Sequence, residues 1–172
     1  MQERIKEKDE AMEKEKMPEK SGKTVKETDA TDKAILNALL DNSRLSYRQI
    51  AVKVGVSVAT VLKRVNALEA SGVIKKYTAV LDYEKLGFDV EALIDIRISK
   101  GKLYEVERKI LKHPNVHAVY DNTGHFDATI VARFPSRRAM DNFLKHIQAF
   151  DFVERTETKL ILKTMKEEGI KV

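Results

Sequence analysis

The chain has 172 residues, of which 42% are hydrophobic, so it holds enough apolar sequence for one or two small domains with a core each. The absence of cysteine excludes disulfides, thiolate zinc sites and a cysteine nucleophile. No apolar run approaches the ~18 residues of a membrane span, and the N-terminus is charged, unlike a signal peptide. We therefore expect a cytoplasmic protein with no membrane partner.

The net charge of +5 is unevenly distributed. Residues 30–86 carry nine basic and five acidic side chains, whereas residues 1–29 carry eight and nine, and residues 87–172 carry fifteen and thirteen. The positive excess in residues 30–86 favours a nucleic-acid-binding region there. Residues 1–29 have no sustained apolar stripe, so we favour a flexible or partner-dependent extension over a docked helix.

The pattern of residues 30–72 predicts three short amphipathic helices in a helix-turn-helix domain. The first is expected over residues 31–40. The second opens with Ser46 and has Gln49 at capping-box spacing, and the third begins at the N-cap Ser57 after a turn at Gly55 and ends at Gly72. The apolar positions expected to face the core are Ile35, Leu36, Leu39 and Leu40, then Tyr47, Ile50, Ala51 and Val54, and finally Val58, Val61, Leu62, Val65 and Leu68.

The second and third helices form the helix-turn-helix motif. The later helix of such a motif enters the major groove of double-stranded DNA, so we expect the third helix to be the reading helix. Small residues near its start let the backbone approach base edges, and two cations follow one turn later. The candidate DNA-binding residues are Ser57, Ala59, Thr60, Lys63 and Arg64, with Ala67 on the same face and Arg44 and Arg48 as phosphate contacts. The alternative for the four cations is an ordinary solvated surface.

The rest of the chain predicts a linker and an α+β domain. Residues 73–81 are rich in β-branched side chains and predict a strand leading out of the head, and residues 82–87 form a natural hinge. Over residues 88–172 the order of elements indicates the ferredoxin-like βαββαβ fold. The first half is expected to hold a strand with Ala92, Ile94, Ile96 and Ile98 inward, and then a helix over 102–113 with Leu103, Val106 and Ile110 inward. Strands over 116–120 and 126–134 follow, with Phe126 and Phe134 in the core. The last elements are a helix capped by Ser136, with Met140, Phe143, Leu144 and Ile147 inward, and a strand over 153–165.

Both helices of this fold cover the same face of the sheet, so we expect a second copy to bury the other face. A homodimer also suits the head, because two helix-turn-helix units on a two-fold axis read half-sites about 34 to 36 Å apart.

Over roughly residues 30–166 the sequence resembles the Lrp/AsnC family, the feast/famine regulators of bacteria and archaea. The resemblance rests on TDKAILNALLDNSRLSYRQIAVKVGVSVATVLKRVNALEASGVIKKYTAVLDYEKLG in the head, and on TGHFD and VERTETKLILKT further along. It implies a sequence-specific transcription regulator with a winged or strand-flanked helix-turn-helix and a ligand-sensing βαββαβ domain. It also implies dimers that associate into octamers and bind amino acids or related metabolites between dimers.

Under this resemblance, residues 57–70 correspond to the recognition helix and residues 123–127 to the effector-site turn. The candidate effector-binding residues are Thr123, Gly124, His125 and Asp127. Backbone N–H groups around Gly124 could hold the carboxylate of an amino acid, and Asp127 could accept from its ammonium. The alternatives are an ordinary hairpin glycine for Gly124 and a solvent-facing residue for Asp127, while residues 156–158 fit a subunit interface as well as a ligand contact.

Other functions have little support in the sequence. No enzyme, metal site or cofactor is expected, because Pro114 keeps His113 and His117 off one helix face and no phosphate loop or serine elbow stands out. An RNA-binding sheet would need exposed aromatic residues on its central strands, whereas Phe126 and Phe134 are better explained as core residues. The remaining alternative is an architectural DNA-binding protein that uses the same head without a small-molecule effector.

Overall fold

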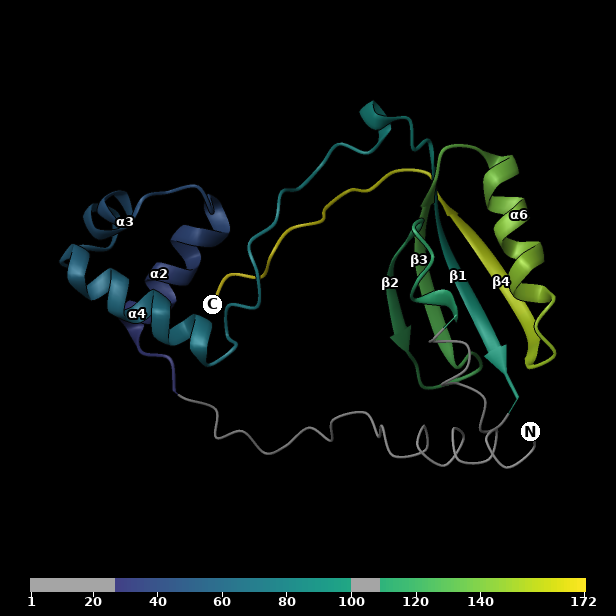
Figure 1. Ribbon diagram of the computed structural model, residues 1–172, viewed down its shortest axis with the longest axis horizontal. Coiled ribbons are helices and arrows are strands. Elements are labelled where there is room, and N and C mark those ends of the chain that lie inside the picture. Colours follow the sequence, from purple (N-terminus) through teal and green to yellow (C-terminus); the bar gives the residue numbers. More distant parts are fainter. Residues whose placement is uncertain (1–26, 100–108) are drawn as a thin grey trace, which may run out of the picture. The chain divides into compact units, whose positions relative to one another are not determined.

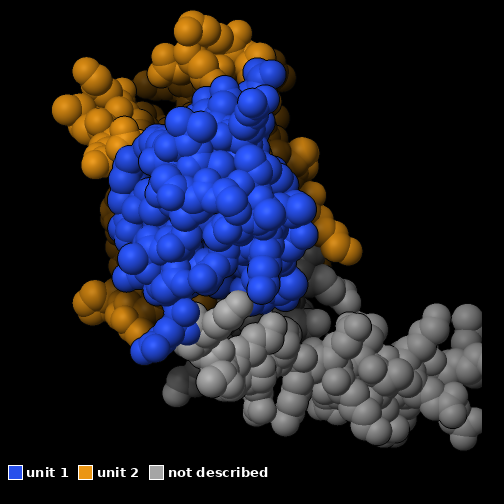
Figure 2. Space-filling model, turned by 90° about the vertical axis from the view of Figure 1, so that its left-hand side faces the viewer, with its two compact units in different colours: residues 1–77, 169–172 blue, residues 78–168 orange. Residues whose placement is uncertain are grey.

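The computed structural model describes residues 27–99 and 109–172. The chain divides into two compact units, residues 1–77 with 169–172 and residues 78–168 (Figure 2). Most of the charged extension predicted over residues 1–29 lies outside the described residues, and so do Leu103 and Val106. Each unit has its own hydrophobic core.

The first unit contains three helices, α2 (Ala30–Asp41), α3 (Tyr47–Val54) and α4 (Val58–Ala70) (Figure 1). The predicted capping box starts α3: the Ser46 side chain accepts from the Gln49 backbone, and Gln49 Oε1 accepts from the Ser46 N–H at 2.8 Å. Ser57 caps α4 by accepting from the Thr60 N–H at 3.1 Å. Gly55 has φ of 77°, a left-handed conformation that favours glycine, so the tight turn between α3 and α4 also follows from the sequence.

The core of the head follows the predicted helical spacing except at three positions. The buried residues are Ile35, Ala38, Ile50, Ala51, Val61 and Val65. Leu40, Val58 and Leu62 were also predicted to face inward but are 49%, 45% and 46% exposed. Two neighbouring helices cover only one stripe of α4, and Leu62 is turned about 100° from the buried Val61. Its apolar side chain therefore remains at the surface.

The strand predicted over residues 73–81 is not formed. These residues are described, and Val80 near the end of the segment is 92% exposed with no strand beside it. A strand is stabilised by its ladder of hydrogen bonds, so β-branched residues without a pairing partner stay extended but irregular. In the predicted hinge, residues Glu84–Leu86 form a short 3₁₀ helix, η1.

The second unit has the predicted ferredoxin-like fold. Its four strands are β1 (Val90–Ile98), β2 (Val116–Asp121), β3 (Ala128–Phe134) and β4 (Val153–Ile161), and helix α6 spans Arg137–Gln148. The strand order is β2-β3-β1-β4 with every neighbour antiparallel (Figure 1). Of the helix predicted over residues 102–113, Lys109 and Ile110 are described as helical, and Ile110 is buried as expected.

The last strand is shorter than predicted. It ends at Ile161 rather than Met165, because Ile161 pairs with Glu91 close to the start of β1 and residues further along have no partner strand. Leu162 is accordingly 95% exposed.

One face of the sheet and α6 enclose the core of this unit. Its buried residues are Ala92, Ile94, Ile96, Ile98, Ile110, Ala128, Ile130, Ala132, Phe134, Met140, Phe143, Ile147 and Phe152. The alternation predicted for β1 is therefore confirmed at all four positions. Ser136 caps α6 by accepting from the Ala139 N–H at 3.2 Å, as predicted.

We expect Phe134→Ala to lower the free energy of unfolding by about 3 to 5 kcal/mol, through lost burial and the cavity left behind. Phe134 is fully buried and its ring centroid lies 5.2 Å from that of Phe143. Urea denaturation followed by circular dichroism would measure the change. The exposed Leu162 offers a control, since Leu162→Ala should change stability by less than about 0.5 kcal/mol. Equal effects of both substitutions would contradict this account of the core.

Candidate functional site

The exposed face of α4 is turned slightly from the predicted one. The exposed positions opposite the buried stripe are Ala59, Lys63, Asn66 and Ala70. Thr60 is half-buried, with its hydroxyl 2.8 Å from that of the cap Ser57, and Ala67 is also half-buried. Asn66 was not among the predicted DNA-binding residues, although its spacing of three from Lys63 places both on one helical face.

Arg64 is oriented toward α2. Its Nη1 atom lies 2.7 Å from an oxygen of Asp29 and 3.3 Å from an oxygen of Asp32. The pKa of Asp29 is lowered, mainly because its carboxylate accepts from the Asp32 backbone N–H and also because Arg64 is near. Sequence reasoning grouped Arg64 with Lys63, but the structure gives the two cations different surroundings.

The other predicted phosphate contacts, Arg44 and Arg48, are both exposed, Arg44 before α3 and Arg48 within it. Two further exposed cations, Lys75 and Lys76, follow the end of α4 in the extended segment. Lys53 is bound to Asp41, with 2.9 Å between Nζ and Oδ2. The basic character predicted for this part of the chain is therefore carried by side chains that reach solvent.

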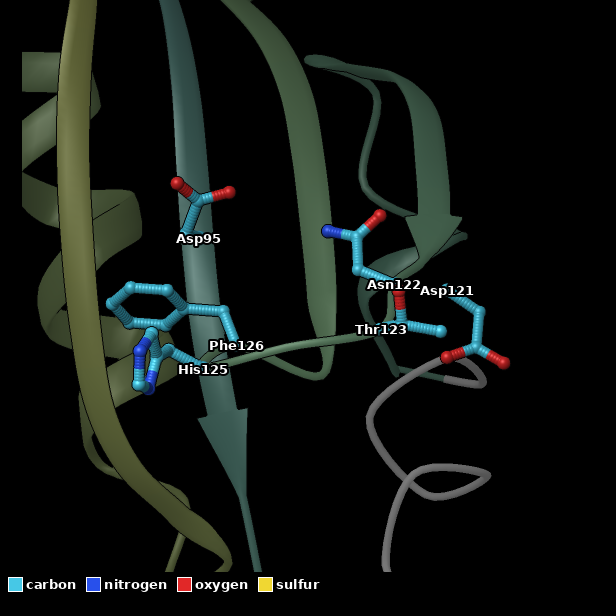
Figure 3. Close-up of a pocket in the computed structure, with 6 residues that line it drawn as sticks. All are labelled: Asp95, Asp121, Asn122, Thr123, His125 and Phe126. Carbon is cyan, nitrogen blue, oxygen red and sulfur yellow. The ribbon is translucent and has the colours of Figure 1, made fainter.

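The second unit contains a shallow cavity of about 470 Å³ at the end of β2 and the turn before β3 (Figure 3). It is lined by Asp95, Asp121, Asn122, Thr123, His125 and Phe126. Figure 3 shows Asp95 on β1 above His125 and Phe126, with Asn122, Thr123 and Asp121 to the right. Two of the predicted effector residues, Thr123 and His125, thus line a real cavity, and Gly124 in the same turn has φ of 117°.

Asp127 does not line this cavity. Its carboxylate accepts from the Ile98 N–H at 2.7 Å, and its own N–H donates to the Ile96 carbonyl at 2.9 Å. Both bonds extend the pairing of β3 with β1 past Ala128. The structure therefore gives one carboxylate oxygen of Asp127 a role in the sheet, and of the predicted effector residues it is Thr123 and His125 that line the cavity.

Phe126 was predicted in the core but is only half-buried at the edge of the cavity. Its ring lies 5.9 Å from the Arg155 guanidinium carbon. Because β3 begins at Ala128, Phe126 belongs to the turn, where strand alternation does not apply. The neighbouring His125 carbonyl accepts from Arg97 at 3.0 Å, which fixes this side of the turn to β1.

Asp95 forms the floor of the cavity and was missed by sequence reasoning. Its side chain accepts from the Thr129 hydroxyl and from Lys159, whose Nζ lies 2.7 Å away. Asn122 in turn donates to the Thr129 hydroxyl at 2.5 Å. Burial alone would raise the pKa of Asp95, but the hydrogen bonds from Lys159 and Thr129 outweigh it, so the pKa is lowered. An aspartate within an apolar alternating strand was the available sequence signal.

We expect Asp95→Asn to destabilise the second unit by about 1 to 2 kcal/mol at pH 7, because a charge-assisted hydrogen bond to a buried carboxylate is lost. The effect should not be larger, because Lys159 is half-exposed and solvent screens its charge. Since folding lowers the pKa of Asp95, its contribution is present above its unfolded pKa of about 3.9 and is lost as the pH falls through the lower folded value. Urea denaturation at pH 7 and below pH 4 tests this. A difference between the two proteins that is unchanged at the lower pH would contradict it.

Within residues 27–99 and 109–172, no three His, Asp or Glu side chains are placed to hold a metal ion. None of the helices in these ranges is long and apolar enough to cross a membrane.

Comparison with known proteins assigns a family to each part of the chain. Residues 28–75 match the winged helix-turn-helix DNA-binding family, and residues 91–170 match the Lrp/AsnC ligand-binding domain. An uncharacterized HTH-type transcriptional regulator of Pyrococcus furiosus is 43% identical over 142 residues, which cover 83% of this chain and 96% of the relative.

Solved structures agree with this assignment. Escherichia coli AsnC superposes with a TM-score of 0.80 at 30% identity, over 85% of this chain and 99% of that structure. A Neisseria meningitidis transcriptional regulator in complex with L-Met gives a TM-score of 0.77 at 27% identity, over 83% and 94%. This chain belongs to the Lrp/AsnC family of helix-turn-helix transcriptional regulators.

Proposed function

We propose that this regulator reads a pseudo-palindromic DNA site through paired α4 helices, and that an amino acid or related metabolite modulates binding from the cavity around Asp95. The observation that carries the effector half of the proposal is a polar cavity within the ligand-binding domain, built on a continuous hydrogen-bond network. Homodimers that can associate into octamers would bring two heads together and complete the ligand site at subunit interfaces.

The exposed face of α4 has the chemistry needed to read DNA. Ala59 is small enough for close approach to the groove, while Lys63 can contact a guanine edge or a phosphate. Asn66 adds an amide, which can bind adenine through two hydrogen bonds. Arg44, before α3, and Arg48, within α3, are exposed and supply positive charge for the phosphate backbone.

The cavity has complementary groups for a zwitterion. Backbone N–H groups around Gly124 and the hydroxyl of Thr123 are available to a carboxylate. The exposed carboxylate of Asp121 lines the cavity and can accept from an ammonium, whereas Asp127 does not line it and has one oxygen bound to the sheet. The L-Met complex of the Neisseria meningitidis relative supports an amino acid as the class of ligand.

The DNA half predicts that Lys63→Ala weakens binding to a specific fragment and lowers the slope of log affinity against log salt by about one, because one cation no longer displaces a counterion. A mobility-shift titration of genomic fragments, including the protein's own promoter, first identifies a fragment that survives non-specific competitor. Fluorescence anisotropy in a salt series then compares the variants. Lys145→Ala, an exposed lysine of α6, is the control and should leave both quantities unchanged. Unchanged binding by Lys63→Ala would contradict the proposed role of α4.

The effector half predicts that at least one amino acid raises the melting temperature of the wild-type protein and changes its affinity for that fragment. A ligand at 100 times its Kd stabilises the folded state by about 2.7 kcal/mol. Asp121→Ala should remove the ligand effect while leaving the unliganded melting temperature nearly unchanged, because Asp121 is exposed. Asp151→Ala, an exposed acid that does not line the cavity, is the control. If no amino acid changes either quantity, the architectural alternative is favoured.

A further inference from the structure

The N-terminal end of α2 holds two acidic side chains in contact with the same backbone turn. Asp29 is the N-cap, and its Oδ1 accepts from the Asp32 N–H at 2.8 Å. Asp32 returns the interaction by accepting from the Asp29 N–H at 3.3 Å. A capping box normally pairs a hydroxyl or a carboxylate with Glu or Gln, so two aspartates here bring two negative charges close together.

Arg64 supplies the cation that this acidic pair requires. It contacts Asp29 at 2.7 Å and both oxygens of Asp32 at 3.3 and 3.4 Å. The Asp32 side chain is only 6% exposed, whereas that of Asp29 is 47% exposed. A buried carboxylate without a cationic partner is strongly destabilising, so the charge of Arg64 is committed to α2.

Because Arg64 lies on α4, its ion pair with Asp29 and Asp32 affects how the exposed face of this helix is oriented. Arg64 lies between the exposed Lys63 and the buried Val65. Val61 and Val65 set which stripe of α4 faces the core, but each apolar contact is non-directional and tolerates small rotations and shifts of the helix. Arg64 Nη1 lies within 3.4 Å of carboxylate oxygens of both Asp29 and Asp32, and this charge-assisted contact is directional, so it limits both rotation and sliding of α4 against α2.

We propose that Arg64 is a positioning residue, which through Asp29 and Asp32 sets the orientation of α4 and thereby of Lys63 and Asn66, and is not itself a DNA contact. This inference rests on the proposed function of α4 as the reading helix. It replaces the prediction, made from sequence, that Lys63 and Arg64 act alike.

The two roles of Arg64 make opposite predictions for the carboxylates that hold it. If Arg64 bound DNA, neutralising a carboxylate would free its charge and remove a repelling one, so affinity would rise. If Arg64 positions α4, the same substitution loosens the helix, so affinity falls although the protein has become more positive. The decisive variant therefore changes an acidic residue rather than the arginine.

Asp29→Asn is the first variant to test, because asparagine is as good an N-cap as aspartate and the helix start is retained. Asp32→Asn is the second, and it removes charge at the buried position. Fluorescence anisotropy with the specific DNA fragment and the full chain would measure affinity and salt slope, and circular dichroism would confirm that each variant is folded. Lys63→Ala is measured alongside as a phosphate- or base-contact reference.

We expect Asp29→Asn and Asp32→Asn to weaken specific binding, by about 5- to 30-fold for Asp32→Asn, which is the factor for about 1 to 2 kcal/mol of lost ordering. The salt slope should stay unchanged, whereas Lys63→Ala lowers it by about one. Arg64→Gln should weaken binding to a similar extent, and adding Asp32→Asn to it should cause little further loss, because both act through the same contact.

Binding by Asp29→Asn that equals or exceeds that of the wild type would overturn the positioning role. So would a loss of one unit of salt slope in Arg64→Gln, since that is the signature of a direct phosphate contact. If either occurs while Lys63→Ala still weakens binding, α4 remains the reading helix and only the role of Arg64 is wrong. If Lys63→Ala has no effect, the proposed function of α4 fails and the positioning role fails with it.

Discussion

The alternation of side chains along the central strand β1 is the constraint on which the ligand-binding domain depends. Ile94 and Ile96 are fully buried on one face, so Asp95 between them must lie on the other. Thr129 stands directly opposite Asp95 on β3, and Lys159 lies two residues along β4 from the position opposite it. An ionised aspartate can be buried there because both neighbouring strands supply donors, and the floor of the cavity follows from the same pattern that builds the core.

Much of the fold could be predicted from sequence because period and capping are local properties. The two-residue period identified the four buried apolar positions of β1, and Ser46, Ser57 and Ser136 start their helices as the capping rules require. The failures have a common cause. The exposed Leu62 and the unpaired segment around Val80 have suitable residue types for a core helix and a strand, but the neighbours that would cover or pair with them are absent in the described part of each unit.

The candidate sites were predicted less completely, because the roles of charged residues depend on contacts distant in sequence. Thr123 and His125 were found, since a glycine turn is visible locally. The roles of Asp95 and Asp127 were not predicted. Only the strand register shows that the Asp127 carboxylate accepts from the Ile98 N–H and that Asp95 faces the cavity. Likewise, no local pattern could separate Arg64 from Lys63, since its partner Asp32 lies 32 residues earlier.

The helix-turn-helix and the ligand-binding domain lie in different compact units, so the proposed effector would have to influence DNA binding from a distance. The backbone passes between the units twice, after Tyr77 and again before Gly169. Those two segments are covalent routes for coupling within one chain, and the proposed association with further copies would add routes between chains. In either case the effector must bind more tightly to the arrangement it favours, since a ligand with equal affinity for all arrangements changes none of their populations. The contact of Arg64 with Asp29 and Asp32 is local to the head, so its proposed effect on DNA binding is separate from the proposed response to an effector, which would begin in the ligand-binding domain.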